Sequence, residues 1–265
     1  MIKGVTKPLF IVYTKLESEQ ATCKGMCICV RKTILFDLDG TLLPLNIDLF
    51  IEKYINAISK FCAPLVEPRA FTRALWFSTD KMLQNEGHGT NEEIFMQHFL
   101  AQLKKNKEEV YPLLEKFYTQ EFGKLQKYIE PSALAQSIVQ KVVDRGWDIV
   151  LATNPVFPRL AIEERMRWAK IDGLPWRYIT TYENSRSSKP SLRYYEEIID
   201  KLQLDPAQCW MVGNDMEEDI VAGKLGFRTY LVTDFLIDKG KGGQVPDYQG
   251  SLQDFWVFVE NDTLN

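Results

Sequence analysis

Residues 33–42 read TILFDLDGTL, a short apolar run that leads directly into two aspartates, a glycine and a threonine. A run of this length and composition is typical of a strand that is buried on both faces in a parallel sheet. Asp37 and Asp39 repel each other, and burial disfavours both charges unless a cation compensates them. A surface turn rich in Asp and Gly has a similar composition, but it does not explain the apolar run. We therefore interpret the stretch as a buried strand that ends in a functional site.

The same pattern recurs along the chain. Apolar runs that stop at a polar residue or at glycine occupy residues 148–152, 209–212 and 228–232, and a weaker one occupies 177–180. Helical patterns cover residues 131–144, 158–169, 192–202 and 219–225, and a last helix is expected at 252–259. Strands that alternate with helices imply right-handed crossover connections. The sequence thus predicts an α/β fold with a Rossmann-like parallel sheet.

Residues 46–129 interrupt this alternation. Their apolar residues recur at helical spacing on several amphipathic faces, and no strand-like run lies among them. We expect an all-helical cap domain inserted after the first strand, so that the core domain consists of residues 32–45 and 130–265. Residues 1–31 are irregular and are interpreted as an N-terminal extension, whose status the sequence leaves open.

Composition narrows the possible functions. The 265 residues include 32 basic and 36 acidic side chains, for a net charge of −4, whereas sequence-independent nucleic-acid binding requires a basic face. No apolar run approaches the length that spans a bilayer, and none near the start resembles a secretory signal. The five cysteines are an odd number, and Cys23, Cys27 and Cys29 fit no zinc-binding spacing. We expect a cytoplasmic protein with no nucleic-acid or membrane partner; its oligomeric state is not determined by the sequence.

Three further polar segments fall on the same side of the predicted sheet as Asp37. They are Thr153 with Asn154, Lys189 before a proline, and the acidic run from Asp215 to Asp219. Ligands bind outside the carboxyl ends of the strands in an open parallel sheet, so these side chains are expected to meet there. Taken singly, each segment has an ordinary explanation. Thr153 with Asn154 could cap a helix, Lys189 could be a solvated surface lysine, and Asp219 could be the N-cap of the helix that follows it.

Taken together and in order, the segments resemble the motifs of the haloacid dehalogenase-like (HAD) superfamily over about residues 33–260. The matching residues are Asp37, Asp39 and Thr41 for the DxDxT motif, Thr153 for the strand-end Thr or Ser, Lys189 for the lysine that often precedes proline, and Asp215 with Asp219 for the acidic motif. The acidic motif often reads Gly-Asp, whereas here Asn214 separates Gly213 from Asp215. A role for Asn214 or for Glu218 in place of Asp215 therefore stays open.

The resemblance implies a phosphoryl-transfer enzyme that uses Mg²⁺. Asp37 would be the nucleophile that forms an aspartyl-phosphate, and Asp39 would act first as acid and then as base. Asp37, the backbone carbonyl of Asp39, and Asp215 would hold the metal, and Asp219 would bind it through water or orient Lys189. The residues expected to bind the phosphoryl group are Thr41, Thr153, Asn154 and Lys189.

The resemblance also bears on the substrate. Asp39 disfavours the dehalogenase and phosphonatase branches, which generally lack this second acid. The inserted helices resemble a cap that closes over the site, which favours a small soluble phosphorylated substrate. Within it, Arg73, Trp76 and His88 are candidate specificity residues, and the loop at 85–90 is a candidate to reach the site. Positions in a surface loop or in the cap core are the favoured explanation of these three residues. A phosphomonoesterase is the main prediction; a sugar phosphomutase and a non-catalytic binding module are the alternatives.

Overall fold

The computed structural model describes residues 31–129, 132–241, 243–261 and 263–264. Its centre is a six-stranded sheet in which all neighbouring strands run parallel, in the order β3-β2-β1-β4-β5-β6. The strands are β1 (Thr33–Phe36), β2 (Asp148–Leu151), β3 (Tyr178–Ile179), β4 (Cys209–Gly213), β5 (Arg228–Val232) and β6 (Tyr248–Gly250). The predicted α/β class with a Rossmann-like parallel sheet is confirmed, and five of these strands coincide with the apolar runs of the sequence.

The register of the sheet decides where the site lies. Phe36, the last residue of β1, pairs with Leu151 on one side and with Val212 on the other. The backbone N–H of Asp37 still donates to the carbonyl of Val212, at 2.9 Å. The residues that follow β1, β2 and β4 therefore emerge at one edge of the sheet, although more than one hundred residues separate the first from the second.

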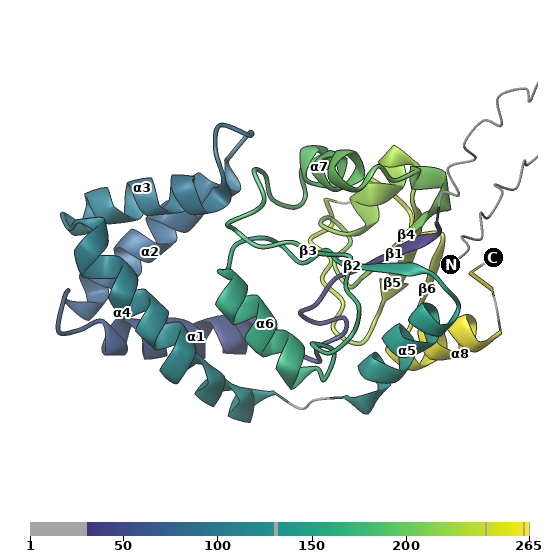
Figure 1. The fold of residues 1–265 in the computed structure, drawn as a ribbon, viewed down its shortest axis with the longest axis horizontal. Coiled ribbons are helices and arrows are strands. Elements are labelled where there is room, and N and C mark those ends of the chain that lie inside the picture. Colours follow the sequence, from purple (N-terminus) through teal and green to yellow (C-terminus); the bar gives the residue numbers. More distant parts are fainter. Residues whose placement is uncertain (1–30, 130–131, 242, 262, 265) are drawn as a thin grey trace, which may run out of the picture.

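Helices cover both faces of the sheet (Figure 1). On one face, α7 (Leu192–Leu202) and the 3-10 helix η3 (Ile220–Leu225) pack against one side of the strands. On the other face lie α5 (Ala133–Asp144) and α8 (Leu252–Glu260), while α6 (Arg159–Trp168) stands between the sheet and the inserted helices. The segment expected as a helix from 219 is thus a 3-10 helix. Asp219 is its N-cap residue, but the Asp219 side chain makes no capping hydrogen bond.

The insertion between β1 and α5 is entirely helical in the described residues. It contains α1 (Ile47–Phe61), α2 (Pro68–Leu83), α3 (Asn91–Leu103), α4 (Lys107–Gln120) and the 3-10 helix η1 (Phe122–Tyr128). Aromatic rings join it to the core: Phe50 and Phe122 both pack on Trp168 of α6, with ring centroids 6.2 and 5.4 Å away. The insertion is therefore all-helical; we call it the cap, and its boundaries at residues 46 and 129 stay a prediction.

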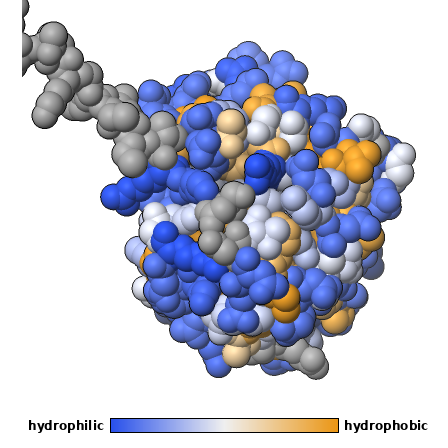
Figure 2. All heavy atoms as spheres, turned by 90° about the vertical axis from the view of Figure 1, so that its right-hand side faces the viewer, coloured by the Kyte–Doolittle hydropathy of each residue, from blue (hydrophilic) through white to orange (hydrophobic). Residues whose placement is uncertain are grey.

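The end of the core opposite the cap is covered mainly by hydrophilic residues, with apolar residues in small groups on the face that Figure 2 shows. None of the described helices has the length and apolar character needed to cross a membrane. Cys62 and Cys209 are buried free thiols. The proposed N-terminal extension, apart from Arg31, and its three clustered cysteines lie outside the described residues.

Candidate active site

The polar strand-end residues border one cavity of about 450 Å³ at the carboxyl edge of the sheet. Helix α1 closes its other side through Ile47, Asp48 and Ile51. The site residues expected from the sequence that line this cavity are Asp37, Asp39, Thr153, Asn154, Asp215 and Asp219, together with Asn214 and Glu218. Residues from three of the four motif segments thus converge at this cavity, whereas Thr41 and Lys189 do not line it.

Asp37 is fixed by a buried lysine behind it. The Nζ atom of Lys189 donates to Asp37 Oδ1 at 3.0 Å and to Asp219 Oδ1 at 2.6 Å, and Lys189 is only 3% exposed. Burial opposes the positive charge of Lys189, but the carboxylates of Asp219 and Asp37 outweigh burial and raise its pKa well above the usual value. Lys189 therefore stays protonated at the edge of the site.

Thr41 and Asn214 hold the turn that carries Asp37. The Thr41 hydroxyl donates to Asn214 Oδ1 at 3.0 Å and lies 3.3 Å from Asp37 Oδ2. The Asn214 amide donates to the backbone carbonyl of Phe235 at 2.6 Å. Gly40 has φ +85° and a Cβ there would lie 2.4 Å from Asn214 Nδ2, so this turn requires glycine. Thr41 does not border the cavity. Its hydroxyl contacts Asp37 and Asn214 and so helps to position the Asp37 carboxylate.

Backbone hydrogen bonds close the same turn on itself. The N–H of Gly40 donates to the Leu43 carbonyl, and the N–H of Leu43 donates to the Leu38 carbonyl, both at 2.8 Å. Leu38, Leu42 and Leu43 are fully buried beneath them. The position of the two aspartates is thus determined by local backbone bonding as well as by the strand.

Asp39 has a partner that sequence reasoning missed. The guanidinium of Arg165, which is fully buried on α6, forms an ion pair with Asp39 Oδ2. Its plane also lies over Phe157, with 4.4 Å between the Arg165 Cζ atom and the ring centroid, and its Nε donates to the Ala161 carbonyl at 3.2 Å. The sequence does carry a signal for this buried arginine. Arg165 follows Ala161 by four residues and Ile162 by three, so it lies on the apolar face of its helix.

The second oxygen of Asp39 is available to a ligand. Asp39 Oδ1 is a buried atom without a hydrogen-bond partner among the described residues, and Asp39 borders the cavity. Burial raises the pKa of Asp39, although the neighbouring Arg165 opposes this. A carboxyl group held on one side and unpaired on the other suits proton exchange with a bound ester.

Thr153 and Asn154 end β2 at the cavity wall. The Thr153 carbonyl accepts hydrogen bonds from the hydroxyls of Thr180 and Tyr194, at 2.7 and 3.0 Å, so the strand end is fixed by two residues that the motifs do not include. The Asn154 amide donates to Glu218 Oε2 at 2.9 Å, and burial raises the pKa of Glu218 to about 7. Asn154 Oδ1 is buried without a partner in the described structure.

Asp215 and Asp219 both line the cavity. Asp215 Oδ1 accepts the backbone N–H groups of Glu217 and Glu218, both at 2.8 Å, and Oδ2 has Lys239 Nζ at 3.8 Å. Asp219 uses one oxygen for Lys189 and the other for the backbone N–H of Asp215, at 3.0 Å. This arrangement favours an orienting role for Asp219.

The donor set fits a hard dication. Within residues 31–129, 132–241, 243–261 and 263–264, no group of three or more Asp, Glu, His or Cys side chains is arranged to hold a metal ion. Mg²⁺ commonly uses one or two carboxylates and completes its octahedron with water and substrate phosphate, so Asp37 and Asp215 meet this requirement. Burial also raises the pKa of Asp215, although the backbone N–H groups of Glu218 and Glu217 oppose this.

The three candidate specificity residues of the cap lie elsewhere. Arg73 and His88 do not line this cavity, and Trp76 lines a separate apolar pocket. The loop at 85–90 reaches the core beside the site: the next residue, Asn91, donates from its backbone N–H to the Ser185 carbonyl at 2.8 Å. Its buried amide lies 3.1 Å from the carbonyls of Pro155 and Ser187.

Known proteins resemble this chain at two levels. The family model of haloacid dehalogenase-like hydrolases matches residues 31–226. A pyrophosphatase PpaX from Anoxybacillus flavithermus is 25% identical over 194 residues, which is 72% of this chain and 78% of the relative.

Solved structures share the fold at lower identity. A HAD phosphatase from Thermococcus onnurineus is 16% identical with a TM-score of 0.53, over 86% of this chain and 97% of its own. An L-2-haloacid dehalogenase from Xanthobacter autotrophicus is 12% identical with a TM-score of 0.53, over 87% of this chain and 98% of its own. A predicted phosphoglycolate phosphatase from Haemophilus somnus is 17% identical with a TM-score of 0.53, over 86% of this chain and 98% of its own. With most of its length matched by the family model and its motif residues gathered at one sheet edge, the chain belongs to the haloacid dehalogenase-like hydrolases.

Proposed function

We propose that the protein is a Mg²⁺-dependent phosphomonoester hydrolase that acts on a small phosphorylated metabolite of the cytoplasm through an aspartyl-phosphate. The observation that carries the proposal is the pairing of two carboxylates with different surroundings. Asp37 is held by Lys189 and Thr41 at the cavity, whereas Asp39 is held by Arg165 and keeps one oxygen without a partner. These surroundings suit a nucleophile and a proton donor, respectively.

In the first step, the Asp37 carboxylate attacks phosphorus while the ester P–O bond breaks. The leaving oxygen takes its proton from Asp39, which then accepts a proton from the water that hydrolyses the aspartyl-phosphate. Two unit charges about 4 Å apart repel by about 4 kcal/mol at an effective dielectric constant near 20, so the attack needs compensating positive charge. Lys189 supplies one such charge, and Thr153 and Asn154 are placed to donate to phosphoryl oxygens.

The metal would be held by Asp37, the backbone carbonyl of Asp39, and Asp215. When bound, Mg²⁺ supplies the further neutralisation of phosphate charge that one lysine does not. Asp219 keeps Lys189 in place through the 2.6 Å bond. The relatives support a phosphorylated substrate, since one is named a pyrophosphatase and another a predicted phosphoglycolate phosphatase.

A panel of phosphate esters tests the proposal. We expect release of inorganic phosphate that requires Mg²⁺, disappears with EDTA and is abolished in Asp37→Asn. The melting temperature of that variant should stay within a few degrees of wild type, which separates loss of chemistry from loss of fold. Turnover that persists in Asp37→Asn contradicts the covalent step, and a requirement for a sugar bisphosphate activator would indicate a phosphomutase. If no ester releases phosphate, the remaining alternative is a non-catalytic binding module.

A further inference from the structure

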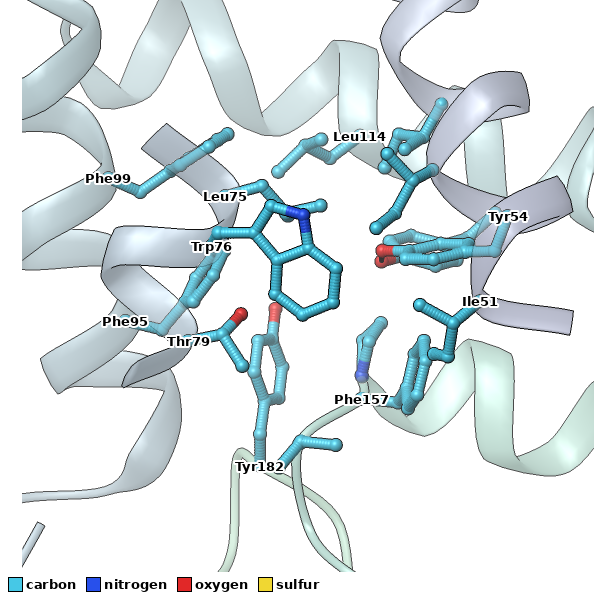
Figure 3. Close-up of a pocket in the computed structure, with 15 residues that line it drawn as sticks. Ile51, Tyr54, Leu75, Trp76, Thr79, Phe95, Phe99, Leu114, Phe157 and Tyr182 are labelled. Atoms are coloured by element: carbon cyan, nitrogen blue, oxygen red, sulfur yellow. Dashed lines mark hydrogen bonds between the residues drawn. The ribbon is translucent and has the colours of Figure 1, made fainter. Parts of the chain in front are cut away.

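The cap contains an apolar pocket beside the active-site cavity (Figure 3). Helices α1 to α4 all contribute to its wall, and the core closes it with residues 156–158 and Tyr182. Aromatic and aliphatic side chains dominate, among them Leu75, Phe95, Phe99 and Leu114. No charged side chain lines it, whereas the neighbouring cavity is bordered by several carboxylates.

The pocket and the cavity adjoin each other. Ile51, Val156 and Phe157 line both of them. Phe157 also lies under the guanidinium of Arg165, the residue that pairs with Asp39. The pocket therefore adjoins the site on the side of the acid that protonates the leaving oxygen, which is where the organic part of an ester extends.

Two hydroxyl groups point into the pocket. Figure 3 shows the side chains of Thr79 and Tyr182 directed toward its interior. In the described part of the chain neither hydroxyl has a hydrogen-bond partner. The hydroxyls of Tyr54 and Tyr118, which also line the pocket, bond each other at 2.8 Å. The pocket can accept one or two polar atoms of a ligand and otherwise only apolar ones.

The size of the void limits the occupant. It measures about 80 Å³, whereas an engineered cavity of ~150 Å³ holds benzene. Trp76 forms part of the wall and is 51% exposed, so its indole can move outward into solvent. A short branched aliphatic group fits the void as it stands, and a single ring fits once Trp76 is displaced.

We propose that this pocket binds the leaving group of the substrate and that this group is uncharged and apolar, a branched aliphatic or monocyclic alcohol esterified to phosphate. The inference rests on the proposed phosphatase function and gives it a substrate class. It sets the chain apart from the relatives named for pyrophosphate and phosphoglycolate, because a charged leaving group would face a wall with no charged partner.

Three esters with primary alkoxide leaving groups isolate the contribution of the pocket: methyl, isopentyl and benzyl phosphate. We expect kcat/KM for isopentyl phosphate to exceed that for methyl phosphate by about tenfold or more, since one methylene in an apolar pocket gives roughly 10–200-fold. Tenfold corresponds to ~1.4 kcal/mol. Pyrophosphate and phosphoglycolate should be poorer substrates than isopentyl phosphate. Equal values for the methyl and isopentyl esters would overturn the proposal.

Two variants tie the preference to the pocket. Thr79→Phe fills the void and should reduce the isopentyl preference to below about threefold. Thr72→Phe, on the same helix but outside both cavities, should keep the preference. Trp76→Ala removes a half-exposed side chain and should raise the ratio of benzyl to isopentyl turnover by about threefold or more. Preferences that are unchanged in both variants would place the leaving group elsewhere.

Failure of the phosphatase proposal can be told apart from failure of this one. If no ester is hydrolysed, calorimetry with the stable analogues benzylphosphonate and methylphosphonate, in the presence of Mg²⁺, still tests the pocket. Tighter binding of the benzyl compound by about tenfold, reduced in Thr79→Phe but not in Thr72→Phe, supports an apolar ligand site. Equal dissociation constants overturn it, whatever the chemistry.

Discussion

Removal of the Arg165 guanidinium should damage both stability and catalysis through Asp39. Arg165→Met keeps an unbranched apolar stem in place of the arginine stem but leaves Asp39 without its cation. Breaking a buried ion pair by removing one partner costs ~3–5 kcal/mol, because an uncompensated charge remains. The Asp39 side chain is 15% exposed and borders the cavity, so water or protonation relieves part of this, and we expect the low end of the range, about 3 kcal/mol. A shift of roughly 2–4 °C per kcal/mol then lowers the melting temperature by about 6–12 °C.

A double-mutant cycle isolates the interaction between Arg165 and Asp39. In Arg165→Met combined with Asp39→Asn, the uncompensated charge is gone, so the double variant should be more stable than Arg165→Met alone by at least about 1 kcal/mol. Chemical denaturation with urea measures all four proteins, and kcat measured on benzyl phosphate reports the catalytic effect. A single variant as stable as wild type, or additive losses in the double variant, would contradict the assignment of Arg165 as the cation that balances Asp39.

Three further changes test other parts of the site and the cap. Lys189→Met should lower kcat by about 10²–10³-fold, because a buried donor and charge beside Asp37 is lost, whereas KM for the ester changes less; a kcat within threefold of wild type would remove Lys189 from the mechanism. Asn91→Ala should lower the melting temperature by about 4 °C or more and speed cleavage of the cap by trypsin, because the buried carbonyls of Pro155 and Ser187 lose their donor; an unchanged proteolysis rate would mean that this bond does not hold the cap. Burial raises the pKa of the Cys62 thiol to about 12, so the folded protein keeps its proton where the unfolded chain loses it, and stability should fall as pH rises from about 9 towards 12. Its labelling by Ellman's reagent at pH 8 should require unfolding, and prompt reaction of the native protein would contradict this.

The parallel core could be predicted from the sequence because its strands are buried on both faces and therefore read as unbroken apolar runs. Four short runs gave the central strands, and the polar residues after them were expected at one edge on topological grounds alone. The edge strand β6 was missed, because two of its three residues are exposed and lack the apolar signal. Residues 219–225 were expected to form a regular helix, but Asp219 uses its side chain to fix Lys189 and the backbone of Asp215, and a 3-10 helix follows instead.

The pairing of Asp39 with Arg165 lies beyond what the motifs can give. The two residues are separated by 126 positions, and their contact depends on how α6 is placed between the sheet and the cap. The same holds for Asn91, whose amide is satisfied by carbonyls that belong to two different loops of the core. Local patterns identify which side chains are chemically competent; the partners that restrain them come from packing between segments.

The closed turn from Leu38 to Leu43 has a mechanical consequence. Its backbone hydrogen bonds are completed before the chain leaves the core, and α1 then begins with its own cap at Asn46. The bonds that fix the turn are therefore made within residues 38–43 and do not depend on the inserted helices. A substitution that loosens the packing of the insertion should leave Asp37 and Asp39 anchored to the sheet.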